Sequence, residues 1–315
     1  MEIEKSARLL YLYQDFIKGA GIQKKAAADR FGVNERSLQR DIEDLRCFFA
    51  NQTPPGEIIY EARQKVYRLV ERDTAHLSNS EVLAVCKILL ESRSLRRDEM
   101  LPILDKLVGC CVPAEQRRAV LDLLANEKHL YIEPHHGKRL LEGLWELGEA
   151  IQQHLVTEIT YEKLKGGETV LRTIEPVGLM FSEYYFYLVA FIRNIDKDTE
   201  FENPDDLFPT IYRVDRIRSF RITGEHFQVP YLERFQEGEF RKRVQFMYGG
   251  KLQKIRFKYT GPSIEAVLDR LPTAEIEKRT EDGWIVKAEV FGKGIEMWLR
   301  SQGKYVKIMG GTNHD

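Results

Sequence analysis

Arg36 and Arg40 are the residues whose type and spacing best suit a binding chemistry. On a helical wheel Leu38, Ile42 and Leu45 share one face, and the two arginines point away from it. A guanidinium group binds a guanine edge or a phosphate through two parallel hydrogen bonds. The spacing therefore predicts a helix that packs on a core with one side and presents two arginines to a DNA groove with the other.

The segments before this helix are those that would position it. Asn34 suits the N-cap, because its side chain can accept from free N–H groups of the first turn, and Gly32 suits the left-handed end of a preceding helix. Two helices are predicted upstream, over Ile3–Ile17 and Lys24–Phe31. Their expected packing residues are Ala7, Leu10, Tyr11 and Phe16 in the first, and Ala26, Ala27 and Phe31 in the second. Helix, break, helix, glycine turn and helix is the helix-turn-helix order, so Asn34, Ser37 and Gln39 join the two arginines as candidate DNA contacts.

Two strand-like runs follow, Glu57–Glu61 and Val66–Val70, joined by a basic turn that contains Arg63 and Lys65. This pattern predicts a β-hairpin wing whose tip contacts the DNA backbone or minor groove. The alternative is that the two arginines are a solvated face of an ordinary three-helix domain. The glycine turn and the basic wing together favour DNA binding.

Composition limits the classes of function. The chain has 315 residues, enough for two or three domains, and a formal net charge of −1, which argues against indiscriminate coating of nucleic acid. Residues 1–72 hold 13 basic and 11 acidic residues, and Glu43 lies near the arginine face. Because so modest a charge gives a single copy little affinity, we expect a homodimer on a near-palindromic double-stranded operator.

Cysteine and histidine give no sign of a metal site or a cofactor. Cys47, Cys86, Cys110 and Cys111 form no CxxC pair, and we expect the vicinal pair to be buried on a helix. The dipeptide His135-His136 follows a proline and is predicted to lie in a loop at a domain joint. There is no apolar run of about 18 residues and no signal peptide, which predicts a cytoplasmic protein with no membrane contact.

The middle of the chain has helical periodicity and no evident chemistry. Ser78 and Glu81 predict a capping box at the start of Ser78–Asn126. The expected apolar positions are Val82, Val85, Ile88, Leu89, Leu101, Leu104, Leu107, Val108, Val120, Leu123 and Leu124. We interpret this segment as a helical linker and as one candidate dimer surface.

From about Leu140 the pattern changes to one helix, Leu141–His154, and then short strands. The strands are predicted at Val156–Tyr161, Thr169–Ile174, Gly178–Phe181, Tyr185–Phe191, Ile211–Val214 and Arg218–Ile222. Short strands joined by tight turns favour a small antiparallel barrel.

Here the chain resembles a known family. Phe186-Tyr187-Leu188, preceded by Pro176-Val177-Gly178-Leu179 and followed by Tyr212-Arg213-Val214-Asp215-Arg216-Ile217, is similar to the WYL domain, with Phe in place of Trp. The Arg36–Ile42 segment also resembles this family's Arg-Thr-Ile-x-Arg-Asp-Ile pattern. Bacterial transcription regulators of this family place a winged helix-turn-helix first, an Sm-like WYL barrel next and a C-terminal extension called WCX last. The resemblance therefore implies those parts in that order.

The C-terminal stretch is predicted as βαββαβ, the ferredoxin-like order. Its elements are expected at Gln253–Tyr259, Ser263–Arg270, Ala274–Arg279, Trp284–Phe291, Gly294–Gln302 and Tyr305–Met309. RNA-recognition modules share this order, but the first strand lacks their Gly-aromatic motif. We interpret the unit as an oligomerisation or regulatory cap, and it is the second candidate dimer surface.

The resemblance implies that the WYL barrel senses a ligand, in some members a nucleic-acid fragment or another phosphate-bearing molecule. The candidate ligand-binding residues are Tyr187, Arg193, Tyr212, Arg213 and Arg216, because guanidinium groups hold phosphate and rings stack on bases. Alternatively, Asp215 and Arg216 form a structural ion pair. Strand alternation places Phe186 and Leu188 in the core, opposite Tyr187. The acidic connection Asp196–Pro209 would repel an anion or act as a lid.

The predicted fold class is α+β multidomain, with four parts: a winged helix-turn-helix (1–73), a helical linker (74–137), an Sm-like WYL domain (138–235) and a ferredoxin-like WCX extension (236–315). The predicted function is a sequence-specific DNA-binding transcription regulator without catalysis or cofactor. Its effector would be an oligonucleotide or nucleotide. Two alternatives stay open, a nucleic-acid-processing enzyme docked by its helix-turn-helix and an RNA-binding adaptor that uses the C-terminal unit. The operator sequence and the sign of regulation are not given by the sequence.

Overall fold

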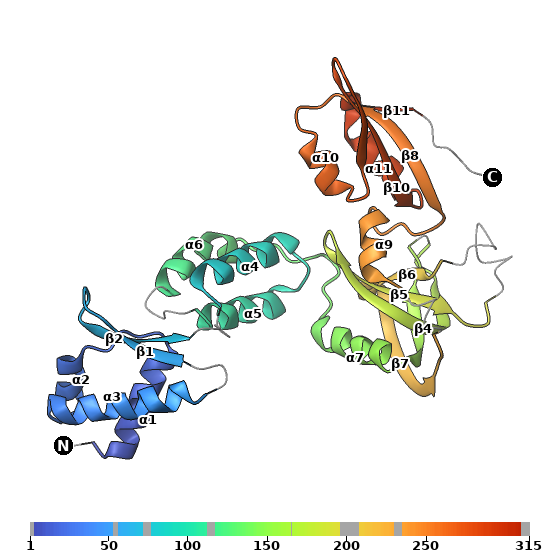
Figure 1. Cartoon of the computed structure of the whole chain (residues 1–315). Coiled ribbons are helices and arrows are strands. Elements are labelled where there is room, and N and C mark those ends of the chain that lie inside the picture. The colour runs from blue at the N-terminus through green and yellow to red at the C-terminus, as the bar shows by residue number, and fades with distance from the viewer. Residues whose placement is uncertain are drawn as a thin grey trace. The chain divides into compact units, whose positions relative to one another are not determined.

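The computed structural model describes residues 3–52, 56–71, 77–111, 117–164, 166–195, 208–229 and 235–309. The chain divides into two compact units, unit 1 over Met1–Glu133 and unit 2 over Pro134–Asp315 (Figure 1). His135 and His136 form a turn just after this division, in the loop predicted there. Residues 196–207 of the acidic connection lie outside the described residues, so its role as a lid stays a prediction.

Unit 1 begins with three helices and a hairpin, in the predicted order. They are α1 (Lys5–Ile17), α2 (Lys24–Phe31), α3 (Glu35–Ala50), β1 (Gly56–Glu61) and β2 (Val66–Glu71). Gly32 ends α2 with a φ of 68°, in the left-handed region that glycine occupies without steric cost. The backbone groups of Ile22 and Tyr67 exchange two hydrogen bonds of 2.9 Å, so the segment between α1 and α2 pairs with the hairpin. The three helices and the hairpin are thereby held together.

The buried face of α1 differs from the predicted one. Leu12 and Phe16 are buried with Arg8, whereas Leu10 is 66% and Tyr11 is 47% exposed. Phe16 is buried as predicted. The prediction was wrong for Leu10 and Tyr11, because Arg8, a charged residue, occupies the inward stripe with Leu12 and Phe16. In α2 the buried alanines are Ala27 and Ala28, and Ala26 is exposed.

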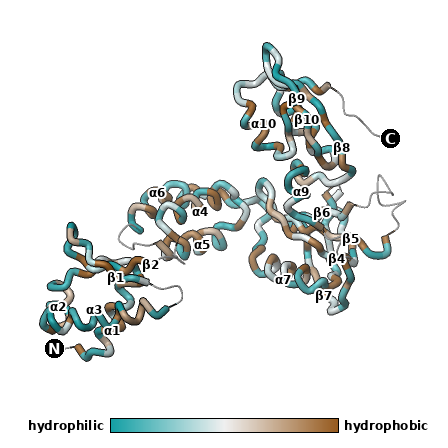
Figure 2. The backbone as a smooth tube through the Cα atoms, viewed as in Figure 1, coloured by the Kyte–Doolittle hydropathy of each residue, from teal (hydrophilic) through white to brown (hydrophobic). Residues whose placement is uncertain are grey.

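Three further helices complete unit 1: α4 (Asn79–Ser92), α5 (Arg97–Gly109) and α6 (Arg117–His129). The Ser78–Glu81 capping box is present. Hydrophobic and hydrophilic positions alternate along these helices (Figure 2). Their buried residues include Val82, Cys86, Leu90, Met100, Leu104, Val108, Val120 and Leu124. Ile88 and Leu123, predicted to pack, are 69% and 59% exposed. The buried stripe of α4 passes through Cys86 and Leu90 instead, and that of α6 passes through Val120 and Leu124.

The vicinal cysteines do not share one environment. Cys111 is buried, whereas Cys110 is exposed at the C-cap of α5, so the expectation that both are buried on a helix was wrong. The helix ends at Gly109, so both cysteines follow it, and the turn directs the two side chains differently. Burial raises the pKa values of the Cys86 and Cys111 thiols, which makes both poor nucleophiles at neutral pH.

Unit 2 begins with α7 (Leu141–Gln152) and an antiparallel sheet. Its strands are β3 (Leu155–Glu162), β4 (Thr169–Ser182), β5 (Tyr185–Ile192), β6 (Thr210–Arg213) and β7 (Ile217–His226), in the order β6-β5-β4-β3-β7. The two strands predicted between residues 169 and 181 are one strand, β4, with a register shift between Pro176 and Gly178. Pro176 has no N–H to give to a neighbouring strand, so a bulge, not a strand end, accommodates it.

This sheet curls on itself. The rings of Tyr161 on β3 and Tyr212 on β6 lie edge to face with centroids 4.9 Å apart, although β4 and β5 separate the two strands in the sheet. The backbone N–H of Arg213 also donates to the Tyr161 hydroxyl over 3.4 Å. These contacts require strong curvature, as a small barrel would have.

The rest of unit 2 is α9 (Glu237–Arg243) followed by β8 (Leu252–Tyr259), α10 (Glu265–Arg270), β9 (Glu275–Thr280), β10 (Gly283–Phe291), α11 (Gly294–Ser301) and β11 (Val306–Ile308). From β8 onward this is the predicted βαββαβ order, and the sheet order is β11-β8-β10-β9. One core joins the sheet to both helices, with Phe257, Val286, Val267 and Trp298 among its residues.

The other side of this sheet carries ion pairs between strands. Arg256 pairs with Glu277 over 2.6 Å, and Lys287 pairs with Glu275 over 2.9 Å. An RNA-recognition module would place aromatic rings on β8 and β10 for base stacking. Charged pairs at these positions give the RNA-binding alternative no stacking platform there.

Candidate nucleic-acid interface and ligand site

Arg36 and Arg40 lie on the exposed side of α3. Leu38 and Ile42, on the opposite side of the same helix, are both fully buried. Among the described residues, neither arginine forms a hydrogen bond or an ion pair with another side chain. Each guanidinium therefore keeps its five N–H donors available for a ligand.

Asn34 and Ser37 are used locally. The Asn34 side-chain oxygen accepts a hydrogen bond from the Ser37 backbone N–H over 2.8 Å, so Asn34 is the N-cap of α3 as predicted. Ser37 is half-buried. The cap fixes where α3 begins and hence the direction in which Arg36 and Arg40 point.

Gln39 is held by the hairpin. The Tyr67 hydroxyl on β2 donates to Gln39 Oε1 over 2.8 Å, and Gln39 Nε2 donates to Glu43 Oε1 over 3.1 Å. Glu43 pairs with Arg46, whose Nε donates to the Ile58 carbonyl on β1 over 3.1 Å. These contacts form a polar chain from β2 along α3 to β1. The primary role of the Gln39 side chain is thus to connect α3 to the β1–β2 hairpin, ahead of any contact with DNA.

A buried ion pair connects α1 to α3. Arg8 and Asp41 are 6% and 1% exposed, and Arg8 donates to both Asp41 oxygens, over 2.5 and 3.3 Å. Arg8 also donates to the Ile3 carbonyl over 2.8 Å. Sequence reasoning did not single out this pair, although Asp41 belongs to the segment that resembles the family pattern. A carboxylate one residue after the last exposed arginine, on the buried face, was the available signal.

The wing tip carries Arg63 and Lys65, and both side chains are exposed. Lys65 has a φ of 56°, which closes the turn between β1 and β2. No ion pair joins either side chain to another described residue. With α3, the tip therefore offers four exposed cations from two elements of the same small domain.

In unit 2, Tyr187 and Arg213 lie side by side on β5 and β6, where they are register partners. Arg213 donates to both oxygens of the buried Asp215, over 3.1 and 2.8 Å, and its guanidinium carbon lies 3.4 Å from the centre of the Tyr185 ring. Burial raises the pKa of Tyr187 to about 12, with the nearby Asp215 adding to the rise and Arg213 opposing it. Arg213 is therefore already bound on two sides.

The other three predicted ligand residues do not join this pair. Tyr212 is buried and points to the opposite face, toward Tyr161. Arg193 follows β5, about 20 Å along the strand from Tyr187 at 3.3 Å per residue, and bridges Glu175 and Glu225 over 2.5 and 2.6 Å. The five residues are thus not one convergent pocket.

Arg216 has a different environment from Arg213. It lies in a short 3₁₀ turn (Val214–Arg216), is half-buried, and has an Nε with no acceptor among the described residues. The alternative of a structural Asp215–Arg216 ion pair was wrong, because Asp215 binds Arg213 instead. Of the three predicted ligand arginines, Arg216 is the one without an ion pair to another described residue.

Two further properties concern the described residues as a whole. No group of three or more His, Cys, Asp or Glu side chains within them is arranged to hold a metal ion. None of their helices combines the length and the apolar character that a bilayer crossing requires.

Comparison with known proteins gives the following relatives. The family model described as the WYL domain matches residues 142–222. Among curated proteins, none matches this chain. A structure of proteasome accessory factor B/C of Arthrobacter aurescens aligns over 97% of this chain and 44% of its own, with 15% identity and a TM-score of 0.29. A crystal structure of a CRISPR Cas-related protein aligns over 98% of this chain and 79% of its own, with 13% identity and a TM-score of 0.36.

This chain spans less than half the length of the first of those structures, and similarity this low establishes neither a shared activity nor a shared partner. The WYL match rests on other ground, because it coincides with α7 and the curled sheet β3–β7. Residues 142–222 of this chain are therefore identified as a WYL domain.

Proposed function

We propose that this protein is a sequence-specific DNA-binding transcriptional regulator that acts as a homodimer and whose WYL domain senses a ligand. The observation that carries the proposal is the state of Arg36 and Arg40. Both are exposed and have no partner among the described residues, on a helix whose other face belongs to the core. A helix of this kind enters the major groove of B-DNA, where arginine reads guanine.

The wing supports the same reading surface. Its tip carries Arg63 and Lys65, which have no partner within the described part of the chain, and its strands are bonded to α3 through Tyr67 and Arg46. Contacts from a wing tip to phosphates fix the register of the protein on the duplex but carry little sequence information. Base reading is therefore assigned to α3 and positioning to the wing.

The homodimer follows from charge. Residues 1–72 have only two more basic than acidic residues, so one copy neutralises few phosphates. Two copies bound to the half-sites of a near-palindrome make twice as many contacts, and they make them with the same residues. Light scattering of the full chain, alone and on its operator, measures this, and a monomer in both conditions contradicts it.

The experiment for DNA binding begins with a duplex selected by the full-length protein from a random-sequence pool. Its affinity is measured by fluorescence anisotropy at fixed salt. Arg36→Ala and Arg40→Ala should each weaken binding by about 1–3 kcal/mol, or roughly 5- to 150-fold, and relax the preference at one base pair. Arg118→Ala, an exposed arginine of α6 paired with Asp122, is the matched control and should have no effect.

Lys65→Ala gives a second, independent signature. Loss of one phosphate contact should reduce the slope of log affinity against log salt by about 1 and leave the sequence preference unchanged. If neither α3 arginine matters and the salt slope is the same in Lys65→Ala, the reading surface lies elsewhere.

For the ligand we propose a phosphate-bearing effector held by Arg216. The WYL resemblance supports that class of ligand, and the unused donors of Arg216 support that residue. Titration of the full-length protein with mononucleotides should show binding that Arg216→Gln abolishes and Arg193→Gln leaves intact. An effector that tightens operator binding must itself bind tighter by the same factor when operator is present. Absence of any phosphate-dependent binding rejects this ligand class and leaves the DNA-binding proposal unaffected.

A further inference from the structure

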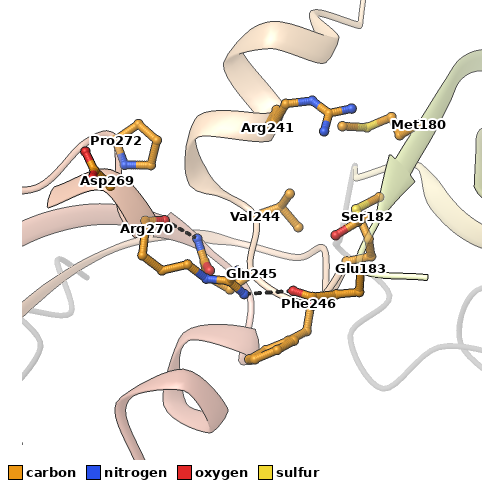
Figure 3. A pocket seen from close by; sticks show the side chains of 11 residues that line it. Met180, Ser182, Glu183, Arg241, Val244, Gln245, Phe246, Asp269, Arg270 and Pro272 are labelled. Carbon is orange, nitrogen blue, oxygen red and sulfur yellow. Dashed lines mark hydrogen bonds and ion pairs between the residues drawn. The ribbon is translucent and has the colours of Figure 1, made fainter. Parts of the chain in front are cut away.

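Unit 2 contains a cavity of about 240 Å³ that the ligand site proposed above does not use. Three segments surround it: the turn between β4 and β5, the end of α9 with the residues that follow it, and the end of α10 (Figure 3). Four of its lining residues carry charge, namely Glu183, Arg241, Asp269 and Arg270. Their formal charges sum to zero, so the cavity has no net attraction for an anion such as a nucleotide.

Arg270 provides the positive side of the cavity. One of its terminal nitrogens donates to Glu183 Oε1 over 3.0 Å, and the guanidinium carbon lies 5.2 Å from the centre of the Phe246 ring (Figure 3). Its Nε is buried and has no acceptor among the described residues. A guanidinium has five donors, so this arginine is held in place with donors to spare. The terminal N–H groups that the hydrogen bond to Glu183 leaves unused can bind an oxyanion of a ligand.

Asp269 provides the negative side. It is the neighbour of Arg270 in the chain, lines the same cavity and is exposed. Its carboxylate forms no hydrogen bond or ion pair with any described residue. A carboxylate beside a cavity with no cation of its own suits a ligand ammonium group. The two unmet groups are therefore of opposite sign and come from adjacent residues.

The remaining wall combines the apolar residues Met180, Val244, Phe246, Met247 and Pro272 with the polar residues Ser182 and Gln245. At about 30 Å³ per water molecule, the cavity has room for roughly eight waters. That is below the range of about 300–1,000 Å³ usual for drug-sized ligands. The space thus suits a small molecule with an apolar body.

The backbone around the cavity is unusual as well. Glu183, Phe246 and Met247 have φ values of 57°, 51° and 56°, in the left-handed region that residues with a Cβ rarely adopt. Such conformations persist where the surroundings impose them and are frequent at ligand sites. Here they direct Glu183 toward Arg270 and bring Phe246 under the guanidinium.

We propose that this cavity binds a small zwitterion of the α-amino acid class with an uncharged, apolar side chain. The ligand carboxylate accepts hydrogen bonds from Arg270, its ammonium group donates to Asp269, and its side chain packs on Met180 and Phe246. Both charges of the ligand are matched, which neither a simple amine nor a simple acid achieves. This site is independent of the proposed DNA binding.

The test is calorimetric titration of the free full-length protein at neutral pH with L-leucine, L-methionine, L-valine and L-phenylalanine. At least one should bind. For the best of them, the analogue without the carboxylate and the analogue without the amine (for leucine, 3-methylbutylamine and 4-methylpentanoate) should each bind at least about tenfold more weakly, since each loses one charged pair. Inorganic phosphate is the competing probe and should not displace the amino acid.

Two variants test which residue binds the carboxylate and which binds the ammonium group of the amino acid. Asp269→Asn, a change at an exposed position, should weaken the amino acid at least about tenfold and leave the affinity for the analogue without an amine unchanged. Arg270→Lys keeps the charge but loses the forked donors, and should weaken the amino acid and that analogue alike. Asp282→Asn and Arg300→Gln, in the same unit but outside the cavity, are the matched controls. Circular dichroism of each variant separates loss of the site from loss of the fold.

The proposal is overturned if none of the four amino acids binds at millimolar concentration, if the single-charge analogues bind as well as the amino acid, or if phosphate displaces it. It is also overturned if both cavity variants bind as the controls do. Because no DNA is present in these measurements, their failure has no bearing on the proposed regulator function.

Discussion

Two arginines of α3 and two of the WYL sheet have the same chemistry and opposite environments. Arg36 and Arg40 are exposed and have no partner among the described residues. Arg193 bridges Glu175 and Glu225, and Arg213 is bound by Asp215 and lies over the Tyr185 ring. From the sequence, the first two were predicted to contact DNA and the other two to bind a ligand. Of these four, only Arg36 and Arg40 have no hydrogen bond or ion pair with another described residue.

The difference shows what decides whether an arginine is structural. A guanidinium that donates to carboxylates through two of its nitrogens, as those of Arg193 and Arg213 do, must give up such a hydrogen bond before it binds a ligand in the same way, which costs about 1.5–3 kcal/mol for a charged pair. A guanidinium without such a partner gives up only hydrogen bonds to water when it binds a ligand. Whether an arginine is structural therefore depends on its acidic partner more than on the arginine itself. Changing such partners should have the following effects.

The largest loss of stability is expected for a change of Asp41, the most buried of these acidic partners. Asp41→Ala leaves Arg8 as a buried charge without compensation and should lower the stability of the helical domain of unit 1 by about 3–5 kcal/mol. Hydrogen exchange of the α1 and α3 amides measures this, because it reports local opening. Asp15→Ala, which removes the partly exposed partner of Arg30, is the matched control and should cost at most about 1 kcal/mol.

A double change distinguishes charge from packing. Arg8→Leu with Asp41→Leu removes both charges and should recover most of the loss, since apolar residues often replace a buried ion pair without penalty. Equal protection in Asp41→Ala and the wild type would show that the Arg8–Asp41 pair does not hold α1 to α3.

The second prediction concerns Arg213. Asp215→Asn removes the charge of its buried partner and should lower the stability of unit 2 by about 1.5–3 kcal/mol. All three tryptophans, Trp145, Trp284 and Trp298, belong to unit 2, so urea unfolding followed by tryptophan fluorescence reports this unit alone.

The same variant sharpens the comparison, because it frees Arg213. Inorganic phosphate should bind Asp215→Asn more tightly than the wild type. If instead the wild type binds phosphate through Arg213, so that Arg213→Ala abolishes binding and Asp215→Asn weakens it, then a paired arginine is a ligand residue here and the comparison fails.

A smaller effect is expected at the link between helix and wing. Tyr67→Phe removes the hydroxyl that donates to Gln39 and keeps the ring, which should cost about 1 kcal/mol of operator affinity. A double-mutant cycle with Lys65→Ala locates the cause. If Tyr67 positions the wing, Lys65→Ala should cost less in the Tyr67→Phe background. Strictly additive losses would show that the two residues act separately.

Much of the fold was predictable because it depends on local pattern. The glycine turn, the N-cap at Asn34 and the Ser78–Glu81 box have sequence signatures with a physical cause, and all three are present. The errors arose where a residue of the wrong type occupied the core. Arg8 on the inward stripe of α1 made Leu10 and Tyr11 look like the packing positions.

The candidate site was less predictable, because pairing is a tertiary property. Nothing in the sequence near Arg193 indicates Glu225, which comes from a different strand, and Gln39 gives no sign of its bond to Tyr67. Asp215 was the exception. An ion pair of Asp215 with an arginine was considered from the sequence, but the arginine was Arg216. In the folded chain Asp215 lies in a 3₁₀ turn and binds Arg213, the last residue of β6.

The last and smallest effect concerns the ionisation of Tyr187, the register partner of Arg213. This ionisation occurs only at high pH, so it does not alter the protein at neutral pH. An unperturbed tyrosine has a pKa near 10, and burial raises the pKa of Tyr187 to about 12. Between these values the folded protein binds more protons than the unfolded chain, so this residue's contribution to stability is complete below pH of about 10 and is lost as pH rises toward 12. The phenolate absorbance of wild type minus Tyr187→Phe, recorded by rapid mixing before unfolding, should have its midpoint near the higher value. Because Asp215 raises this pKa and Arg213 lowers it, Asp215→Asn should move the midpoint down and Arg213→Gln should move it up. A midpoint near the unperturbed value, insensitive to both changes, would mean that Tyr187 is solvated and that the Arg213–Asp215 pair does not lie beside it.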